Sequence, residues 1–292
     1  MTKFMRAHMK GFSLILLSLF LFSCQTQVED IEIIDSHIHF FDPTRKEGVM
    51  WPPKTMKEIY KPTYPKHFAE TAKANNVKKA VVVQASNSVM DAQWNLDITS
   101  KKPDFYAGIV CNLSTLGTKE FRSDIDKVLK NPRTVGLRIT HPPIDRPFFS
   151  KEMLDDLRYV ASKNVSLDIL AHRFKFDDLV KIADEVPNLR IMIGLYRKSP
   201  EQINKMASRK NVYCKSGVPI NKSQAEINEY LSLILKEFGE DRIVFGSNWP
   251  VTKLADYKLK KKLLFEFLKD KGNSAVEKIF HDNAEKFYRL KR

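Results

Sequence analysis

Two histidines close an apolar run in the segment Ile33-Ile34-Asp35-Ser36-His37-Ile38-His39. In a β-strand, residues i and i+2 share a face, so His37 and His39 are predicted to point to the same side. Two imidazoles at that spacing can bind one divalent metal ion. They can also line a pocket without metal, and the motif alone leaves both interpretations open. Asp35 is expected to orient a histidine from behind.

Two cationic residues end later strand-like runs. Arg138 is a candidate for binding a substrate carboxylate because its planar guanidinium suits bidentate pairing, although a structural ion pair would also explain it. Lys215 is a candidate for stabilising a developing oxyanion, and the alternative is a lysine that reaches the surface.

Further residues are candidates for contacting a ligand. Gln84 and His141 follow strand-like runs and can form hydrogen bonds. The long segment 42–65 carries aromatic residues, which either cover a bound ring as a lid or anchor the loop; they are Trp51, Tyr60 and Tyr64.

The elements that position these residues alternate between strand-like and helical patterns. Apolar strand-like runs begin near Ile31, Ala80, Tyr106, Val135, Val165, Arg190, Asn211 and Arg242. Helical patterns follow at residues 68–74, 94–101, 120–129, 151–162, 176–186, 201–207, 224–238, 257–269 and 274–288. Eight strands alternating with helices predict a parallel sheet, and a chain of this length favours its closure into a (β/α)8 TIM barrel. In that fold the chemistry lies at the carboxyl ends of the strands.

The first residues have the pattern of an export signal. Three basic residues precede the apolar run 12–22, which is shorter than the roughly 20 residues needed to span a bilayer. The run ends in Leu21-Phe22-Ser23-Cys24, which resembles a bacterial lipobox. Cys24 is therefore predicted to become the lipidated N-terminus.

The chain is thereby divided into three parts. Residues 1–23 are the predicted lipoprotein signal peptide, 24–30 a short tether, and 31–292 a single barrel domain. This predicts a location at the cell envelope, in the bacterial periplasm or at the outer membrane, with the N-terminal lipid as the only contact with the membrane.

The composition is typical of a globular enzyme, with 43% hydrophobic and 29% charged residues. The net charge is +14, but the lysines are scattered along helices, which indicates a solvated basic surface rather than a nucleic-acid partner. A small-molecule substrate is the expected partner. Cys111 and Cys214 lie in strand-like runs and are expected to be buried thiols.

Short motifs follow one another along the chain. They are Asp35-Ser36-His37-Ile38-His39 with Phe40-Phe41-Asp42-Pro43, Val83-Gln84-Ala85, Val135-Gly136-Leu137-Arg138, Lys215-Ser216-Gly217, Gly246-Ser247-Asn248-Trp249-Pro250 and Ile279-Phe280-His281-Asp282-Asn283-Ala284. Together they resemble the amidohydrolase superfamily, in the branch that contains sugar-lactone and pyrone-dicarboxylate lactonases. The resemblance runs from about Ile31 to the C-terminus and implies hydrolysis of a small ester, in particular a sugar-derived or carboxylated lactone.

The resemblance also implies a metal site. The superfamily typically uses the His-x-His pair, histidines from strands five and six, and an aspartate from strand eight. His37 and His39 match the pair, and His172 matches the strand-five position. The strand-six run 191–196 contains no histidine, and Asn248 replaces the aspartate. Three histidines would suffice for one divalent ion such as zinc, and a metal-free site is the equal alternative.

The exchange at Asn248 bears on catalysis, because an amide cannot take a proton from water near neutral pH. Three functions therefore remain open. One is a lactone hydrolase with His37, His39, His172, Lys215 and Asn248 at its centre. The second is a catalytically impaired barrel that binds a ligand at the envelope, and the third is a decarboxylase-like lyase.

Overall fold

The structure, a computed structural model, describes residues 27–142, 149–196 and 198–290. The predicted signal peptide and Cys24 lie outside these residues. Among the helices of the described ranges, none has the length and apolar character needed to cross a membrane.

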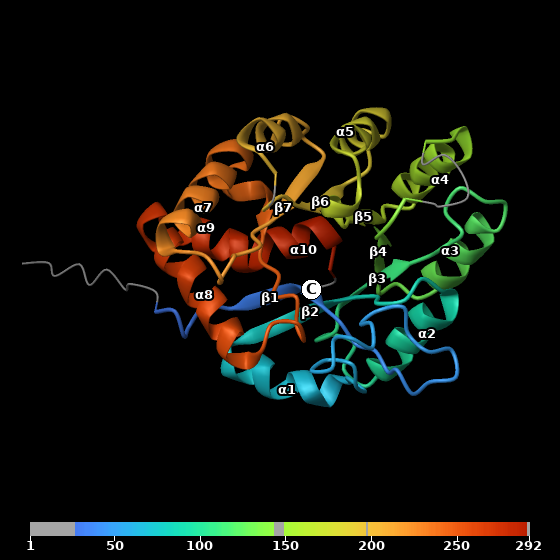
Figure 1. Cartoon of the computed structure of the whole chain (residues 1–292), viewed down its shortest axis with the longest axis horizontal. Helices are drawn as coiled ribbons and strands as arrows, with labels where there is room; N and C mark the ends of the chain where they lie inside the picture. Colours follow the sequence, from blue (N-terminus) through green and yellow to red (C-terminus); the bar gives the residue numbers. More distant parts are fainter. Residues whose placement is uncertain (1–26, 143–148, 197, 291–292) are drawn as a thin grey trace, which may run out of the picture.

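Eight parallel strands pair in sequence order at the centre of the molecule (Figure 1). They are β1 (Ile33–Ile38), β2 (Val77–Val83), β3 (Gly108–Asn112), β4 (Thr134–Ile139), β5 (Ser166–Ile169), β6 (Ile191–Gly194), β7 (Val212–Lys215) and β8 (Ile243–Val244). The segment after β8 returns to β1, where the Ser36 amide donates to the Phe245 carbonyl oxygen at 3.2 Å and the His39 amide to that of Trp249 at 2.8 Å. The predicted (β/α)8 barrel is confirmed.

Helices surround the barrel (Figure 1). They are α1 (Pro65–Ala74), α2 (Val89–Ile98), α3 (Phe121–Leu129), α4 (Lys151–Ser162), α5 (Phe176–Glu185), α6 (Pro200–Ala207), α7 (Gln224–Phe238), α8 (Leu254–Leu268), α9 (Asn273–Glu277) and α10 (Asn283–Tyr288). Helix α2 begins earlier than the predicted residue 94, because the Ser88 hydroxyl accepts a hydrogen bond from the Asp91 amide at 3.1 Å and caps the helix.

The interior of the barrel is polar toward the carboxyl ends of the strands and apolar toward their amino ends, its lower layer. Apolar residues from alternate strand positions pack there against α10 and the residues after it; they are Ile34, Val81, Val83, Val110, Val135, Met192, Val244, Ala284, Phe287, Tyr288 and Leu290. Nearer the carboxyl ends of the strands lies the polar layer, which consists of Asn112, Arg138, Asp168 and Lys215. Helix α10 therefore closes the end of the barrel opposite the predicted site (Figure 1).

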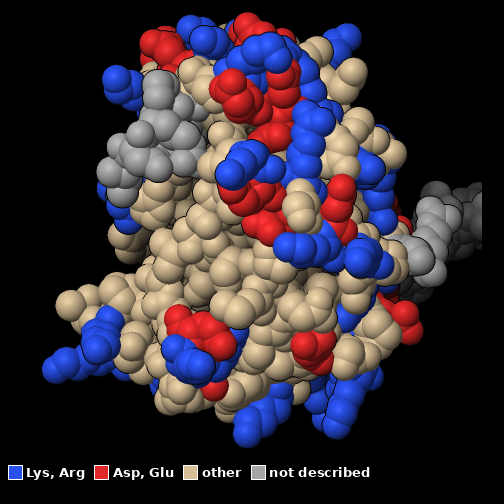
Figure 2. Space-filling view, turned by 90° about the vertical axis from the view of Figure 1, so that its right-hand side faces the viewer, with Lys and Arg blue, Asp and Glu red and all other residues tan. Residues whose placement is uncertain are grey.

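The outer surface carries mixed charges. Figure 2 shows basic and acidic side chains side by side on one face, which is the right-hand side in Figure 1. Ion pairs on α3 and α4 include Lys127 with Asp124 at 3.2 Å and Arg158 with Asp155 at 3.1 Å. Most of such pairs are exposed, so each contributes little to stability. Cys111 and Cys214 are buried and free, as expected.

Candidate active site

Barrel closure brings His37, His39 and Asn248 together. The Asn248 amide donates to the His37 carbonyl oxygen at 2.9 Å, and Asn248 has a left-handed backbone with φ 62°, which Asn tolerates better than most residues. The Nε2 atoms of the two histidines are 3.0 Å apart, and Asn248 Oδ1 is 3.3 Å from His39 Nε2. The side-chain amide of Asn248 thus lies beside the pair that the i, i+2 spacing predicted.

Hydrogen-bond partners fix the proton on each imidazole. His39 Nδ1 is 2.6 Å from the Val83 carbonyl oxygen, which only accepts, so the proton of His39 is on Nδ1 and Nε2 is an acceptor. The ammonium of Lys215 only donates, and it lies 2.8 Å from His37 Nδ1. The proton of His37 is therefore on Nε2, from which it is donated to His39 Nε2.

Lys215 uses all three of its N–H groups within the protein. Its Nζ donates to the Ser36 carbonyl oxygen at 3.2 Å, to His37 Nδ1 at 2.8 Å and to Asp168 Oδ2 at 2.9 Å. An ammonium has three donors, so none remains for a substrate oxygen in this arrangement. Lys215 therefore acts on the site through His37 and through its charge.

Arg138 is a second cation in the polar layer, and the residues that the structure describes use few of its donors. Its Nη1 donates to the Gln84 carbonyl oxygen at 3.3 Å, and it forms no ion pair with any other residue that the structure describes. Burial lowers the pKa of Arg138 to about 10, and the nearby Asp168 opposes the shift. The guanidinium therefore stays charged at neutral pH with donors available to a ligand.

The histidines are weak bases in this environment. Burial, followed by the charge of Arg138, lowers the pKa of His39 to about 3. Burial and the charge of Lys215 likewise hold the pKa of His37 well below its ordinary value. Burial also lowers the pKa of Lys215, while Asp168 raises it. Both imidazoles are consequently neutral at pH 7.

The other predicted ligand contacts lie at different depths. The Trp51 ring is 5.0 Å from that of His39, so the long first loop does reach the histidine pair. Gln84 is buried, and its side-chain amide donates to the carbonyl oxygens of Ser88 at 2.7 Å and Asn112 at 3.2 Å. His141 is exposed, with its Nδ1 3.1 Å from the Thr140 hydroxyl oxygen.

Loop anchoring accounts for one of the aromatic residues. The Tyr64 hydroxyl donates to Asp42 Oδ2, and the Asp42 carboxylate also accepts from the Thr44 amide at 2.8 Å. Tyr64 therefore holds the first loop in place from its far end.

Asp35 orients the backbone rather than an imidazole ring. Its carboxylate accepts from the amides of His37 at 3.1 Å and Ser247 at 3.0 Å and from the Tyr257 hydroxyl at 3.1 Å. Asp35 was expected to orient a histidine, and it does so through the backbone amide of His37, since its carboxylate lies on the outer side of β1. It instead ties β1 to the segment after β8.

The donors around the histidine pair do not fit a divalent ion. A metal would need the Nε2 lone pair of both imidazoles, but Lys215 forces the proton of His37 onto Nε2. His172 is exposed on the short helical turn Ala171–Arg173, and no cluster of three His, Cys, Asp or Glu side chains in the described ranges is able to hold a metal ion. Two cations also face the same space, so an additional cation would be repelled.

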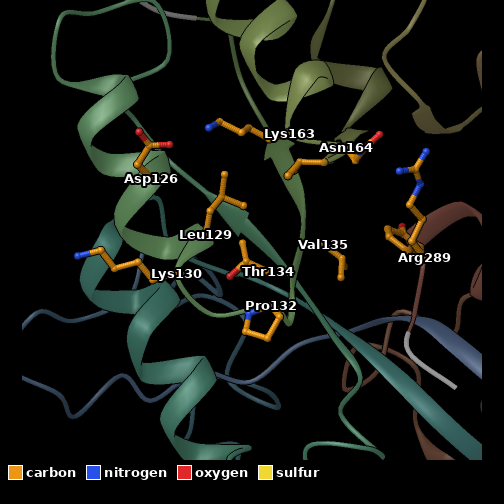
Figure 3. A pocket seen from close by; sticks show the side chains of 11 residues that line it. Asp126, Leu129, Lys130, Pro132, Thr134, Val135, Lys163, Asn164 and Arg289 are labelled. Carbon is orange, nitrogen blue, oxygen red and sulfur yellow. The ribbon is translucent and has the colours of Figure 1, made fainter.

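A cavity of about 490 Å³ lies at the opposite end of the barrel (Figure 3). Thr134 and Val135, at the start of β4, border it together with Lys163 and Arg289. None of the predicted site residues lines it. Because the chemistry of such barrels lies at the carboxyl ends of the strands, this cavity is not the candidate site.

Two buried residues of the site escaped the sequence analysis. Asp168 was not among the candidates, yet a charged residue inside an apolar strand needs a partner and could have been singled out. Tyr288 gave no such signal, because it lies on the closing helix. Its hydroxyl donates to Asp168 Oδ2 at 2.8 Å.

Comparison with known proteins supports the resemblance of the motifs. A family model described as amidohydrolase matches residues 34–290. L-fucono-1,5-lactonase from Burkholderia ambifaria is 28% identical over 291 residues, which cover 89% of this chain and 96% of the lactonase.

Solved structures share the fold at lower identity. An amidohydrolase from Burkholderia multivorans with bound zinc superimposes with a TM-score of 0.77 at 18% identity, covering 89% of this chain and 99% of that one. A probable 2-pyrone-4,6-dicarboxylic acid hydrolase from Acinetobacter baumannii with citric acid bound gives a TM-score of 0.67 at 18% identity, covering 88% of this chain and 99% of the other.

Proposed function

Because this chain belongs to the amidohydrolase family, we propose that it hydrolyses a small ester, in particular a sugar-derived or carboxylated lactone. The observation that carries this proposal is Arg138, a charged group close enough to lower the pKa of His39, with donors that the described residues leave unused. A carbonyl or carboxylate oxygen of a lactone would satisfy those donors. The likeness to a lactonase supports the choice of substrate class.

The reaction is derived without a metal, because the donors of the site do not fit one. Water attacks the lactone carbonyl carbon and transfers a proton to His39 Nε2 beside Asn248, which gives up the hydrogen bond from His37 as it takes the proton. Arg138 stabilises the negative charge on the carbonyl oxygen. The ring C–O bond then breaks, and the leaving alkoxide takes the proton back from His39. A base with a pKa of about 3 makes the first step slow.

The proposal is tested by turnover of two lactones. Purified protein is mixed with L-fucono-1,5-lactone or 2-pyrone-4,6-dicarboxylate in the presence of a chelator, and acid release and product mass are followed. We expect hydrolysis of at least one, and we expect Arg138→Met to raise its KM by about 10-fold to 100-fold, the scale of a lost hydrogen bond to a charged group. Arg122→Met, on the exposed face of α3, is the control and should leave KM unchanged.

Two other outcomes separate the alternatives. Binding of a lactone without turnover would favour the ligand-binding protein, for which Asn248 in place of a carboxylate is the supporting observation. Release of carbon dioxide from a carboxylated substrate, without ring opening, would favour the lyase. Either result contradicts lactone hydrolysis.

We propose further that the protein is anchored at the cell envelope through a lipid on Cys24, which lies outside the described residues. Changing Cys24 to Ser should move the protein from the membrane fraction to the soluble one, or block its processing, when a bacterial host carries the full chain. Several acyl chains, each CH₂ contributing about 0.8 kcal/mol when buried, account for durable anchoring in the unaltered protein. An unchanged fractionation and an unchanged mass would contradict the anchor.

A further inference from the structure

Helix α10, which closes the end of the barrel opposite the active site, contributes a polar group that reaches the polar layer. Tyr288 is 1% exposed and packs with Ala284 and Phe287 in the apolar lower layer. Its hydroxyl nevertheless reaches Asp168 Oδ2 at 2.8 Å, at the level of the polar layer. A residue from the last helix thereby contacts a carboxylate of β5.

Asp168 joins Tyr288 to Lys215. Its Oδ2 accepts from both the Tyr288 hydroxyl and the Lys215 ammonium, at 2.8 Å and 2.9 Å, while Oδ1 is buried without a hydrogen-bond partner in the described part of the protein. The carboxylate is 4% exposed, so water competes little for it. Two donors on one oxygen restrict both the position of the carboxylate and the direction in which Lys215 points.

Lys215 has room to cross the strand that separates it from Asp168. That strand, β6, ends at Gly194, which pairs in register with Lys215. A Cβ atom built on Gly194 would have no neighbour within 4 Å, so the space beside the lysine is open. No side chain of Gly194 holds Lys215 from the side, so its direction depends on its hydrogen bonds, among which Asp168 is the charged partner.

We propose, on the basis of the proposed lactone hydrolysis, that Tyr288 and Asp168 are positioning residues that aim Lys215 at His37 and so keep the proton of His37 on Nε2. Asp168 accepts hydrogen bonds from Tyr288 and Lys215. Lys215 also donates to His37, which in turn donates to His39. His39 donates to the Val83 carbonyl oxygen. Loss of the first contact loosens Lys215, and both protonation sites of His37 then become populated. The consequence is the loss of the hydrogen bond from His37 Nε2 to His39 Nε2, which orients the His39 ring in the site.

The test replaces Tyr288 with Phe, which removes the hydroxyl and keeps the ring in the apolar layer. Long-range ¹H–¹⁵N spectra of protein labelled at histidine report which ring nitrogen carries the proton, with signals assigned by single histidine replacements. We expect His37 protonated at Nε2 and His39 at Nδ1 in the unaltered protein, and a mixture at His37 in Tyr288→Phe. With a hydrolysed lactone, kcat should fall about tenfold and KM should change less than about twofold, because the substrate does not touch Tyr288.

Tyr230→Phe is the matched control. It also removes a buried hydroxyl, but one from α7 outside the barrel, where it lies beside the Cys214 thiol and not beside Asp168 or the histidine pair. It should change neither the His37 signals nor kcat. Asp168→Asn is a second variant, expected to mix the His37 signals in the same way.

Unchanged His37 signals in folded Tyr288→Phe, or a proton on Nδ1 of His37 in the unaltered protein, would overturn the positioning role. The spectra need no substrate. A protein that hydrolyses no lactone but whose His37 signals respond to Tyr288→Phe therefore contradicts the proposed function and leaves the positioning role supported.

Discussion

Replacing Lys215 with Met is expected to lower kcat/KM for a hydrolysed lactone by about 10²-fold to 10³-fold, the scale of removing one preorganised electrostatic group. The ammonium donates to His37 Nδ1 at 2.8 Å and fixes the proton of that imidazole. It also contributes positive charge to a polar layer in which negative charge develops during ester hydrolysis. The measurement is steady-state kinetics with the lactone that the unaltered protein turns over.

Stability has to be separated from activity in this variant. Removing Lys215 leaves Asp168 charged and buried, which costs about 3–5 kcal/mol when one member of a buried pair is lost. The double variant Lys215→Met with Asp168→Asn removes both charges, so its thermal midpoint should return toward that of the unaltered protein while activity stays low. A folded Lys215→Met protein with kcat/KM within about threefold of the unaltered protein would contradict this role.

Changing Asn248 to Asp is expected to raise lactone hydrolysis by about 10²-fold, the usual contribution of a positioned general base. Asn248 Oδ1 is 3.3 Å from His39 Nε2, so a carboxylate there would stand beside the attacking water. Asp and Asn are nearly isosteric and both accept the left-handed backbone of this position. The charge of Arg138, which forms no ion pair within the described residues, would stabilise the carboxylate, so little change in thermal midpoint is expected.

The control for this gain adds the same charge at another point of the polar layer. Asn112 of β3 pairs in register with Arg138 of β4. The Asn112→Asp variant therefore places a carboxylate near the same cation, but without a neighbouring histidine pair. It should bring no gain in activity. If the unaltered protein already hydrolyses lactones efficiently and Asn248→Asp slows it, another group is the base and this account of the exchange is wrong.

Local sequence patterns were enough to predict the barrel and part of its site. The alternation of strand-like and helical segments defined the fold, because each segment buries one face and its periodicity is visible within a few residues. The i, i+2 spacing placed His37 and His39 on one side of β1 for the same reason. The helix starts were less accurate, as at α2, where the Ser88 cap decides the first residue.

What each site residue is able to bind depends on distant parts of the chain. Lys215 was a candidate from the sequence, but only its three partners on β1 and β5 reveal that no donor remains for substrate. His172 follows β5 as the family pattern requires, yet the short helical turn leaves it exposed. A pattern in the sequence places a residue on a strand, whereas the side chains of other strands decide what it can bind.

The sequence by itself determined the barrel, the paired histidines and the exchange of a carboxylate for Asn248. The tertiary structure alone decided which protons the histidines hold, because that depends on Val83 from β2 and Lys215 from β7. It alone joined Tyr288 to Asp168, which lie 120 positions apart in the chain. Periodicity reports the face on which a side chain lies, but a hydrogen bond needs a donor and an acceptor within about 3 Å. Such distances between remote segments are set by strand register and by the docking of α10.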